Sequence, residues 1–424
     1  MMNKKFFRFV PSFSRDAWLY LVNTFFAGLM FGLQYLFFNL YILKLGYNQE
    51  FIGLLASTSA LSTAILALPF GVLIPKFGNK RSLIAGTFLQ IVAFLGWTLL
   101  PARFTLVMAS ALFGAGYCLI SVNAAPFMAA ITTPDKRTAL FSMQFSLNTL
   151  AGVVASGIGG VLPPLFAHIF GVPAEGVTTY RMILLIAMGV TVLSLVPLAL
   201  LRGHRSPTPS APAFSERVTG HQRILIKLTV AQFMIALGAG ILIPFVNVFY
   251  KMRFDLPDPV LGGLFAISSL AMGLSALFVP ALVKRLGKIR TMILTQLLSI
   301  PFLILMGFSA SFPLSAFGYL MRTALMSMNL PIFNAYAMGI VSGRLRPVTS
   351  SLLVLSWNGG WAAGSFVSGH IQSKMGFSSV FLLTASLYLI ASGIVYTFFH
   401  SIDDTVGVEY NIYNDRRGSI PPKL

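Results

Sequence analysis

The sequence Gly71-Val-Leu-Ile-Pro-Lys-Phe-Gly-Asn-Lys-Arg81 forms a basic, glycine-containing turn between two long apolar runs. A similar stretch recurs about half a chain later, where residues 280–290 read Pro-Ala-Leu-Val-Lys-Arg-Leu-Gly-Lys-Ile-Arg. The glycine of the first turn, Gly78, falls on Gly287 of the second, and the flanking basic residues coincide at the same offset. The recurrence predicts an internal duplication in which both turns lie on the same side of a membrane.

The composition is typical of a membrane protein with many spanning segments. Of the 424 residues, 56% are hydrophobic and only 10% are charged. The 30 Lys and Arg residues outnumber the 11 Asp and Glu residues, and they concentrate in alternate gaps between apolar runs. The positive-inside rule explains this placement. We therefore expect an integral protein of the plasma (inner) membrane with both termini cytoplasmic, and we expect no nucleic-acid partner.

Runs of about 20 apolar residues are candidate spanning helices, because in lipid the backbone must satisfy its own hydrogen bonds. About twelve such runs occur, near residues 17–45, 50–75, 82–101, 104–131, 138–170, 179–201, 224–250, 260–283, 290–310, 313–342, 348–373 and 377–400. We predict an all-α polytopic membrane protein whose twelve transmembrane helices form two pseudo-symmetric six-helix bundles around a central cavity. The predicted parts are the bundles at residues 1–202 and 224–400, a Pro/Ser-rich cytoplasmic linker at 203–223, and a cytoplasmic tail at 401–424.

The halves also match outside the basic turns, since Asn123 falls on Asn329 and Arg137 on Arg346 at nearly the same offset. In these features the chain resembles the major facilitator superfamily, whose members are twelve-helix secondary transporters. The family's signature after its second helix, its turn after the fourth helix, and their second-half copies imply a role in gating for Gly71, Lys76, Gly78, Lys80, Arg81, Arg137, Arg285, Gly287 and Arg346.

The chain departs from the family signature at the acidic position, which is Pro75 here and Lys284 in the second half. In similar transporters that acid joins a cytoplasmic charge network that holds the outward-facing state closed. Pro75 cannot do so, and Asp135 is the nearest cytoplasmic acid that could substitute. The usual charge-locked gate is therefore not expected at these turns.

No carboxylate is expected at mid-membrane, because all 11 acids fall in loops, tails or helix ends. Many proton-coupled relatives carry such a carboxylate in the cavity, so its absence weighs against proton coupling and against strongly cationic substrates. His168 and His370, toward the outer ends of their helices, are the remaining candidates for a titratable site. An interfacial hydrogen bond is the alternative role for either histidine.

Arg322 is the one basic residue well inside an apolar run. With Met326, Asn329, Phe333 and Tyr336 it repeats along one helical face. One interpretation is a cavity wall whose arginine donates to a carboxylate, a phosphate or a polar oxygen. The alternatives are an arginine that snorkels to the outer headgroups, or a helix pair packed on Met and Phe.

In the superfamily, helices 1, 4, 7 and 10 line the central cavity, so the resemblance directs attention to the amides in those four runs. Each amide alone is better explained by a structural hydrogen bond between helices. The predicted substrate-binding residues are Gln34, Asn39, Asn123, Gln232, Asn247, Arg322, Asn329, Asn334 and Tyr336. As a set they describe a cavity that is polar but almost uncharged.

Glycines recur at residues 152–160 and 359–369, where they predict close packing between helices. The single cysteine, Cys118, lies in an apolar run, so neither a disulfide framework nor a metal cluster is expected. The sequence contains no nucleotide-binding loop and no nucleophile beside a base. We expect no catalytic residues, no metal and no cofactor. We therefore expect that the protein is not an enzyme.

The sequence thus predicts a monomeric secondary transporter, active or facilitative, that moves a small-molecule substrate through the lipid bilayer by alternating access. Export of a neutral or weakly anionic amphipathic compound is favoured, because Phe and Met are abundant, Arg322 is available and carboxylates are absent. Uptake of a sugar-like polar nutrient is the alternative. A hypothesis of another class is a membrane scaffold or lipid-handling protein that transports no soluble substrate.

Overall fold

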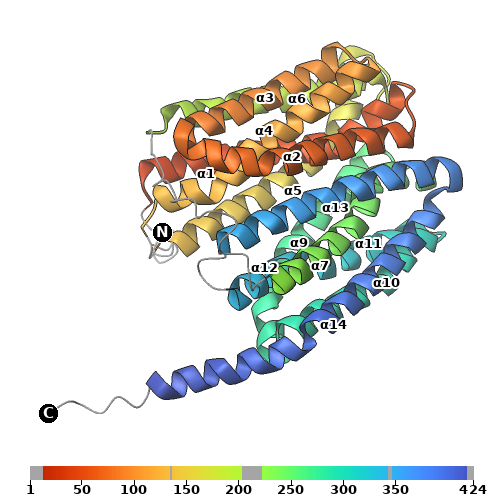
Figure 1. Cartoon of the computed structure of the whole chain (residues 1–424). Coiled ribbons are helices and arrows are strands. Elements are labelled where there is room, and N and C mark those ends of the chain that lie inside the picture. Colours follow the sequence, from red (N-terminus) through yellow and green to blue (C-terminus); the bar gives the residue numbers. More distant parts are fainter. Residues whose placement is uncertain (1–12, 134–135, 203–221, 342–345, 418–424) are drawn as a thin grey trace, which may run out of the picture.

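The computed structural model describes residues 13–133, 136–202, 222–341 and 346–417 (Figure 1). Within these ranges the regular structure is entirely helical, which confirms the predicted all-α fold. In chain order, the elements are α1 (Arg15–Lys44), α2 (Gln49–Phe77), α3 (Asn79–Leu99), α4 (Arg103–Ala130), α5 (Arg137–Phe170), α6 (Val177–Leu200), α7 (Gln222–Leu242), η2 (Ile243–Phe245), α8 (Val246–Phe254), α9 (Asp258–Leu286), α10 (Lys288–Phe308), α11 (Phe312–Ser327), α12 (Asn329–Ile340), α13 (Arg346–Met375) and α14 (Phe377–Arg417).

Two of the predicted spans are interrupted helices. The seventh runs through α7, η2 and α8, and its break contains Pro244, which lacks the N–H that a continuous helix needs. The tenth is divided between α11 and α12 at Met328, just before Pro331. Ten spans in the described ranges are long and apolar enough to cross a membrane, and α11–α12 and α13 complete the twelve.

The helices form two bundles, α1–α6 and α7–α14, which pack along α2 against α13 and α5 against α9 (Figure 1). We call the end of the molecule with the turns at Gly78 and Gly287 the basic end. The end with the turns at Gly46, Gly171 and Gly376 is the opposite end.

The two basic turns have the same backbone geometry. Gly78 has φ of +89° and its N–H donates to the carbonyl of Ile74 at 2.8 Å. Gly287 has φ of +79° and its N–H donates to the carbonyl of Val283 at 2.9 Å. Each glycine ends one helix and begins the next, and the positive φ explains why glycine stands there in both copies.

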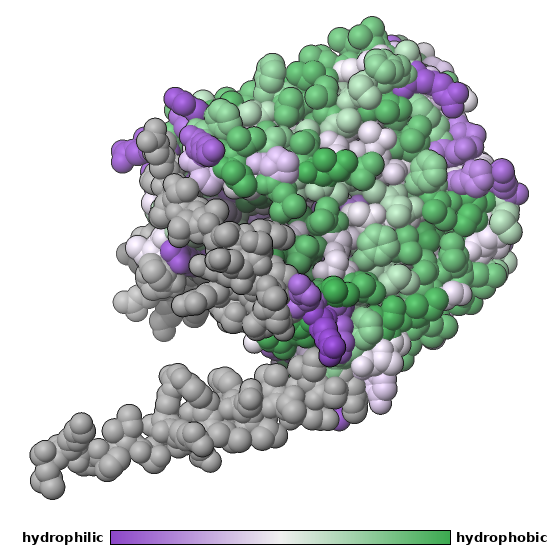
Figure 2. All heavy atoms as spheres, in the orientation of Figure 1, coloured by the Kyte–Doolittle hydropathy of each residue, from purple (hydrophilic) through white to green (hydrophobic). Residues whose placement is uncertain are grey.

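Apolar side chains cover the flank of the molecule in Figure 2, and hydrophilic side chains gather toward its two ends. Large residues such as Phe104 and Leu277 lie 75% and 73% exposed. Exposure of this extent is expected of a surface that faces lipid tails rather than water.

The buried apolar side chains form three clusters, and their distribution differs between the ends. Toward the opposite end, one cluster contains residues of both halves, including Phe37, Trp97, Phe249 and Phe381. Toward the basic end, each half has its own cluster, around Phe127 in the first half and Phe333 in the second. The halves therefore share a core at the opposite end and have separate cores at the basic end.

Candidate functional site

A cavity of about 490 Å³ lies between the halves, a volume typical of small-molecule sites. Its aromatic lining consists of Phe31, Tyr35, Phe38, Trp97, Phe113, Tyr117, Trp357 and Trp361. Its hydrogen-bonding lining consists of Gln34, Asn39, Ser59, Thr63, Ser110, Asn148 and Asn358. No Asp, Glu, Lys, Arg or His belongs to this lining in the described part of the chain.

Helical spacing explains how these side chains converge. On α1, Phe31, Tyr35 and Phe38 lie at i, i+4 and i+7 on one broad face. On α13, Trp357 and Trp361 lie one turn apart, with ring centroids separated by 6.1 Å. The cavity therefore has aromatic walls contributed by both halves, with amides placed between them.

Of the nine predicted binding residues, only Gln34 and Asn39 line this cavity in the described structure. Asn39 donates to the carbonyl of Pro244 and to Oδ1 of Asn247, the latter at 3.2 Å. Asn247, which is buried, donates back to the carbonyl of Leu36 at 3.0 Å. This pair joins α1 of the first half to α8 of the second half at the cavity, because Asn39 also belongs to its lining.

The other predicted amides do not line the cavity, and neighbouring helices enclose all of them except Asn334. Asn123 is fully buried and donates to the carbonyl of Asn79 at 2.7 Å. Asn329 donates to the hydroxyl of Thr295 at 3.1 Å, which joins α12 to α10. Gln232 is also buried, whereas Asn334 is exposed away from the cavity lining.

The helical face predicted from Arg322 to Tyr336, which lies on α11 and α12, is also inside the second half rather than on the cavity wall. Arg322 is 2% exposed, donates to the hydroxyl of Tyr388, and lies 5.6 Å from the centroid of that ring. Tyr336 packs edge-on against Phe399, with a centroid distance of 5.3 Å. Arg322 therefore neither snorkels nor reaches the cavity; α14 covers it.

Sequence reasoning missed the contribution of α13 and α5. Trp357, Asn358 and Trp361 of α13 and Asn148 of α5 line the cavity, whereas the family resemblance directs attention to four other helices. One signal was available in the composition. The chain has only 4 tryptophans, and Trp97, Trp357 and Trp361 all line this cavity.

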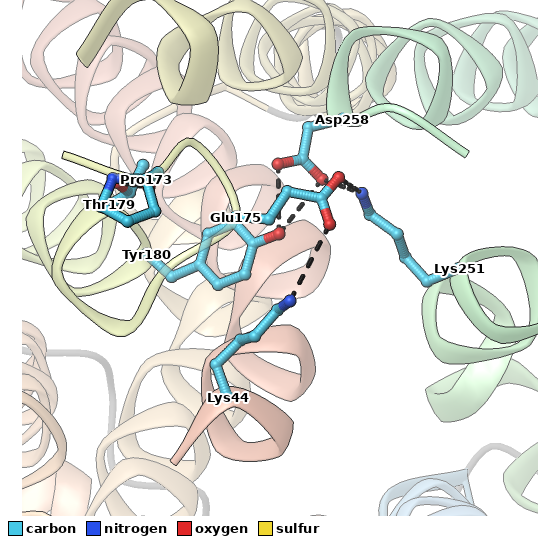
Figure 3. Close-up of polar contacts among 7 residues, drawn as sticks. All are labelled: Lys44, Pro173, Glu175, Thr179, Tyr180, Lys251 and Asp258. Atoms are coloured by element: carbon cyan, nitrogen blue, oxygen red, sulfur yellow. Dashed lines mark hydrogen bonds and ion pairs between the residues drawn. The ribbon is translucent and has the colours of Figure 1, made fainter. Parts of the chain in front are cut away.

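A charged network closes the halves together at the opposite end (Figure 3). We call Lys44, Glu175, Tyr180, Lys251 and Asp258 the latch. Lys251 forms ion pairs with Glu175 and with Oδ1 of Asp258, the latter at 2.7 Å. The Tyr180 hydroxyl donates to Oδ2 of Asp258 at 3.1 Å, and Lys44 lies 3.9 Å from Glu175.

The latch crosses the interface twice, because Glu175 and Tyr180 belong to the first half while Lys251 and Asp258 belong to the second. The side chains of Lys251 and Asp258 are 9% and 2% exposed, whereas Lys44 is 44% exposed. Helix ends favour the arrangement, since Asp258 begins α9 and Lys251 lies in the last turn of α8. Two cations and two carboxylates make the network neutral.

Glycines let helices of the two halves approach each other closely toward the opposite end. A Cβ added to Gly53 of α2 would lie 3.1 Å from Cα of Gly369 in α13, and one added to Gly262 of α9 would lie 2.7 Å from Cα of Gly160 in α5. His370 is adjacent and lies 3.5 Å from Glu50 across the same interface. Both histidines lie toward the opposite end, but His370 contacts the other half, whereas His168 is exposed near the end of α5.

The sequence pattern of the Major Facilitator Superfamily matches residues 20–227 and, separately, residues 228–409. The chain belongs to this family. The resemblance inferred from the basic turns is therefore confirmed, and the family's pattern matches the chain twice, once in each half.

Known proteins match the chain at low identity, and solved structures among them share its fold. An uncharacterized membrane protein of Saccharomyces cerevisiae is 20% identical over 94% of this chain and 97% of its own length. A crystal structure of the nucleoside transporter NupG superposes with a TM-score of 0.72 at 12% identity, over 91% of this chain and 99% of that one. The crystal structure of a bacterial homologue of the iron transporter ferroportin, in an inward-facing state, superposes with a TM-score of 0.71 at 15% identity. The match covers 91% of this chain and 98% of that one.

The superfamily's signature turns show no charged network of their own among the residues described. Lys80 donates to the carbonyls of Ala199 and Leu201 at 2.6 and 2.7 Å, and Arg137 donates to the carbonyl of Ala129 at 3.3 Å. The remaining predicted gating residues with described side chains, namely Gly71, Lys76, Gly78, Arg81, Arg285 and Gly287, lie at least partly exposed around the two turns. Asp135 and the side chain of Arg346 lie outside the described residues.

Proposed function

We propose that this member of the superfamily is a secondary transporter, active or facilitative, for a small neutral amphipathic solute. The observation that carries the proposal is the cavity, which combines aromatic walls with amides and hydroxyls and has no charged side chain among its described lining. Such a lining binds apolar or planar faces by contact and fixes polar groups by hydrogen bonds. The enclosure of Arg322 by Tyr388 favours a neutral solute over the weakly anionic one that the sequence also allowed.

Alternating access is supported by the difference between the two ends. The latch, the glycine contacts and the shared apolar cluster close the opposite end, while the halves have separate cores at the basic end. The concentration of Lys and Arg at the basic end favours a cytoplasmic location for that end. On that orientation the structure represents an inward-facing state, and the reverse state requires the latch to separate.

Export from the cytoplasm across the plasma (inner) membrane by a monomer, with both termini cytoplasmic, remains the favoured form of this proposal. All cavity residues come from one chain, so a monomer suffices for binding. Uptake of a sugar-like nutrient is the second candidate, because three tryptophans stand beside four amides, which suits stacking on a ring and hydrogen bonding to its hydroxyls. A scaffold without flux has no need of so polar a cavity.

The test is a thermal-shift screen of the purified protein against neutral, anionic and sugar-like solutes. A solute at about 100 times its Kd should stabilise the folded state by about 2.7 kcal/mol. We expect neutral amphipathic solutes to raise the Tm of the parent protein and to lose that effect in Asn358→Leu and Trp361→Ala. Trp18→Ala is the matched control, because Trp18 is 43% exposed and does not line the cavity.

Stabilisation only by carboxylates, lost in Arg322→Lys but kept in Asn358→Leu, would overturn the proposed solute class. Transport of any solute so identified should proceed in proteoliposomes without a pH gradient, because the described cavity lining has no titratable carboxylate or histidine. A strict requirement for a pH gradient would contradict that expectation.

A further inference from the structure

A second hollow lies on the first half near the basic end, away from the transport cavity. It has a volume of about 250 Å³ and is lined by Phe70, Leu73, Ile74, Phe77, Arg81, Ser82, Ala85 and Leu119, from α2, α3 and α4. We call it the α2–α3 groove. Its walls are apolar except at Arg81 and Ser82, and the Ser82 hydroxyl donates to the carbonyl of Gly78 within its own helix.

Arg81 is therefore the polar group that the groove offers to a ligand. Its side chain is exposed, and it has no hydrogen bond or ion pair with any residue that the structure describes. The neighbouring Lys80, by contrast, is engaged by two carbonyls at the end of α6. Helix α3 also begins at Gly78 without a side-chain cap, so its positive end adds to the attraction for an anion beside Arg81.

Comparison with the second half shows that the groove depends on particular side chains. At the offset that places Arg81 on Arg290, the small Ala85 falls on Leu294, a larger residue. Leu73 and Ile74 fall on Leu282 and Val283, which pack against the second half's own buried cluster. In the first half, Leu73 is instead 37% exposed, whereas Ile74 is buried at 4%. Phe77 is 61% exposed and its counterpart Leu286 is 38% exposed.

We propose that the α2–α3 groove binds an anionic phospholipid, with an acyl chain against the apolar walls and the phosphate on Arg81. The stretch from Phe70 to Phe77 extends about 10 Å along α2, which suits the upper part of an acyl chain. A guanidinium at the membrane surface pairs with a phosphate through two parallel hydrogen bonds. The site is separate from the transport cavity, so its occupant is not the transported solute.

The experiment is native mass spectrometry of the purified protein titrated with phosphatidylglycerol or phosphatidylcholine of the same acyl composition. We expect phosphatidylglycerol to bind more tightly, and Arg81→Gln to weaken it about fivefold, the effect of one basic residue near a membrane surface. Ala85→Leu copies the second half and should weaken both lipids by filling the groove. Arg290→Gln removes the equivalent charge of the second half and should leave the tight phosphatidylglycerol site intact.

Equal binding of the two lipids, or unchanged phosphatidylglycerol binding in Arg81→Gln, would overturn the proposal. Because Arg81 is exposed, that variant tests the phosphate contact even if Ala85→Leu folds poorly. Excess inorganic phosphate should not displace phosphatidylglycerol, since the acyl chain contributes to binding. Full displacement by phosphate would show an ion site without a lipid groove and would also contradict the proposal.

Discussion

Lys251 is the residue on which the latch depends, because it contacts Glu175 of the first half and Asp258 of its own half. Asp258 is 2% exposed, so its carboxylate has little access to water once the cation is removed. Removing one partner of a buried ion pair lowers stability strongly, because the remaining charge stays buried and unpaired. The two halves would then lose their main electrostatic connection at the opposite end.

We therefore expect Lys251→Met to lower the free energy of unfolding of the purified protein, in the state closed at the opposite end, by about 3 kcal/mol. The change is measured as a lower Tm in detergent. Lys374→Met is the matched control, because Lys374 lies in the last turn of α13, toward the opposite end of the molecule, and its side chain is exposed. An equal Tm for the two variants would show that the latch does not stabilise this state.

Arg322 gives a second prediction at this scale. Its guanidinium is buried and donates to the Tyr388 hydroxyl, so Tyr388→Phe should lower stability by about 1–3 kcal/mol, as expected for the loss of a hydrogen bond to a charged group. Solute affinity, measured by thermal shift, should change little, because neither residue lines the cavity. The opposite result, intact stability with weakened binding in Arg322→Lys, would return Arg322 to the binding site.

Individual side chains were the least predictable level of the structure. Of the predicted amides, Gln34 and Asn39 line the cavity. The pattern does not say which amides are hydrogen-bonded by a neighbouring helix, as Asn123 and Asn329 are. The latch was also not predicted, because in the sequence Lys251 and Asp258 simply lie between the apolar runs at 224–250 and 260–283. Their pairing depends on segments that are far apart in the sequence and meet only in the fold.

Helices were predictable because the bilayer fixes their length and apolar character. The sixth predicted run, residues 179–201, corresponds to α6 at Val177–Leu200. An apolar run does not show where a helix breaks, or whether it continues beyond the apolar residues. The structure differs from the predicted runs in both ways. The run at 224–250 is broken at Pro244, and α14 continues as a helix to Arg417, beyond the predicted span.

The glycines of α5 and α9 give a prediction at the scale of elements. A Cβ on Gly262 would lie 2.4 Å from the carbonyl oxygen of Ser156 and 2.7 Å from Cα of Gly160, whereas one on Gly263 would meet nothing within 4 Å. Gly262→Ala should therefore hold the two helices apart and favour opening at the opposite end. Gly263→Ala, the control, should not.

This prediction is measured by the labelling rate of Ser59→Cys in intact cells with a membrane-impermeant thiol reagent. Ser59 lines the cavity, and the native Cys118 is buried and should react slowly. On the proposed orientation, Gly262→Ala should raise the rate severalfold over the parent. A rate that rises equally with Gly263→Ala would show that close approach of α5 and α9 does not control access.

At the scale of the whole molecule, the charged closure lies at the end away from the family's signature turns. Pro75 and Lys284 replace the acid of those turns, and the basic end has a separate apolar cluster in each half. The opposite end has a neutral latch and one cluster shared by both halves. The state described here is therefore stabilised by contacts at one end, and a transport cycle requires those contacts to break.

The most direct test is a distance measurement by double electron–electron resonance in lipid nanodiscs, in a Cys118→Ala background. One label pair, Ala102→Cys with Lys374→Cys, spans the opposite end, and a second pair, Lys76→Cys with Arg285→Cys, spans the basic end. We predict a main short distance at the opposite end, and in Lys251→Met a growing longer population there, matched by shortening at the basic end. A single, unchanged distance at both ends in both proteins would contradict alternating access and favour a rigid scaffold.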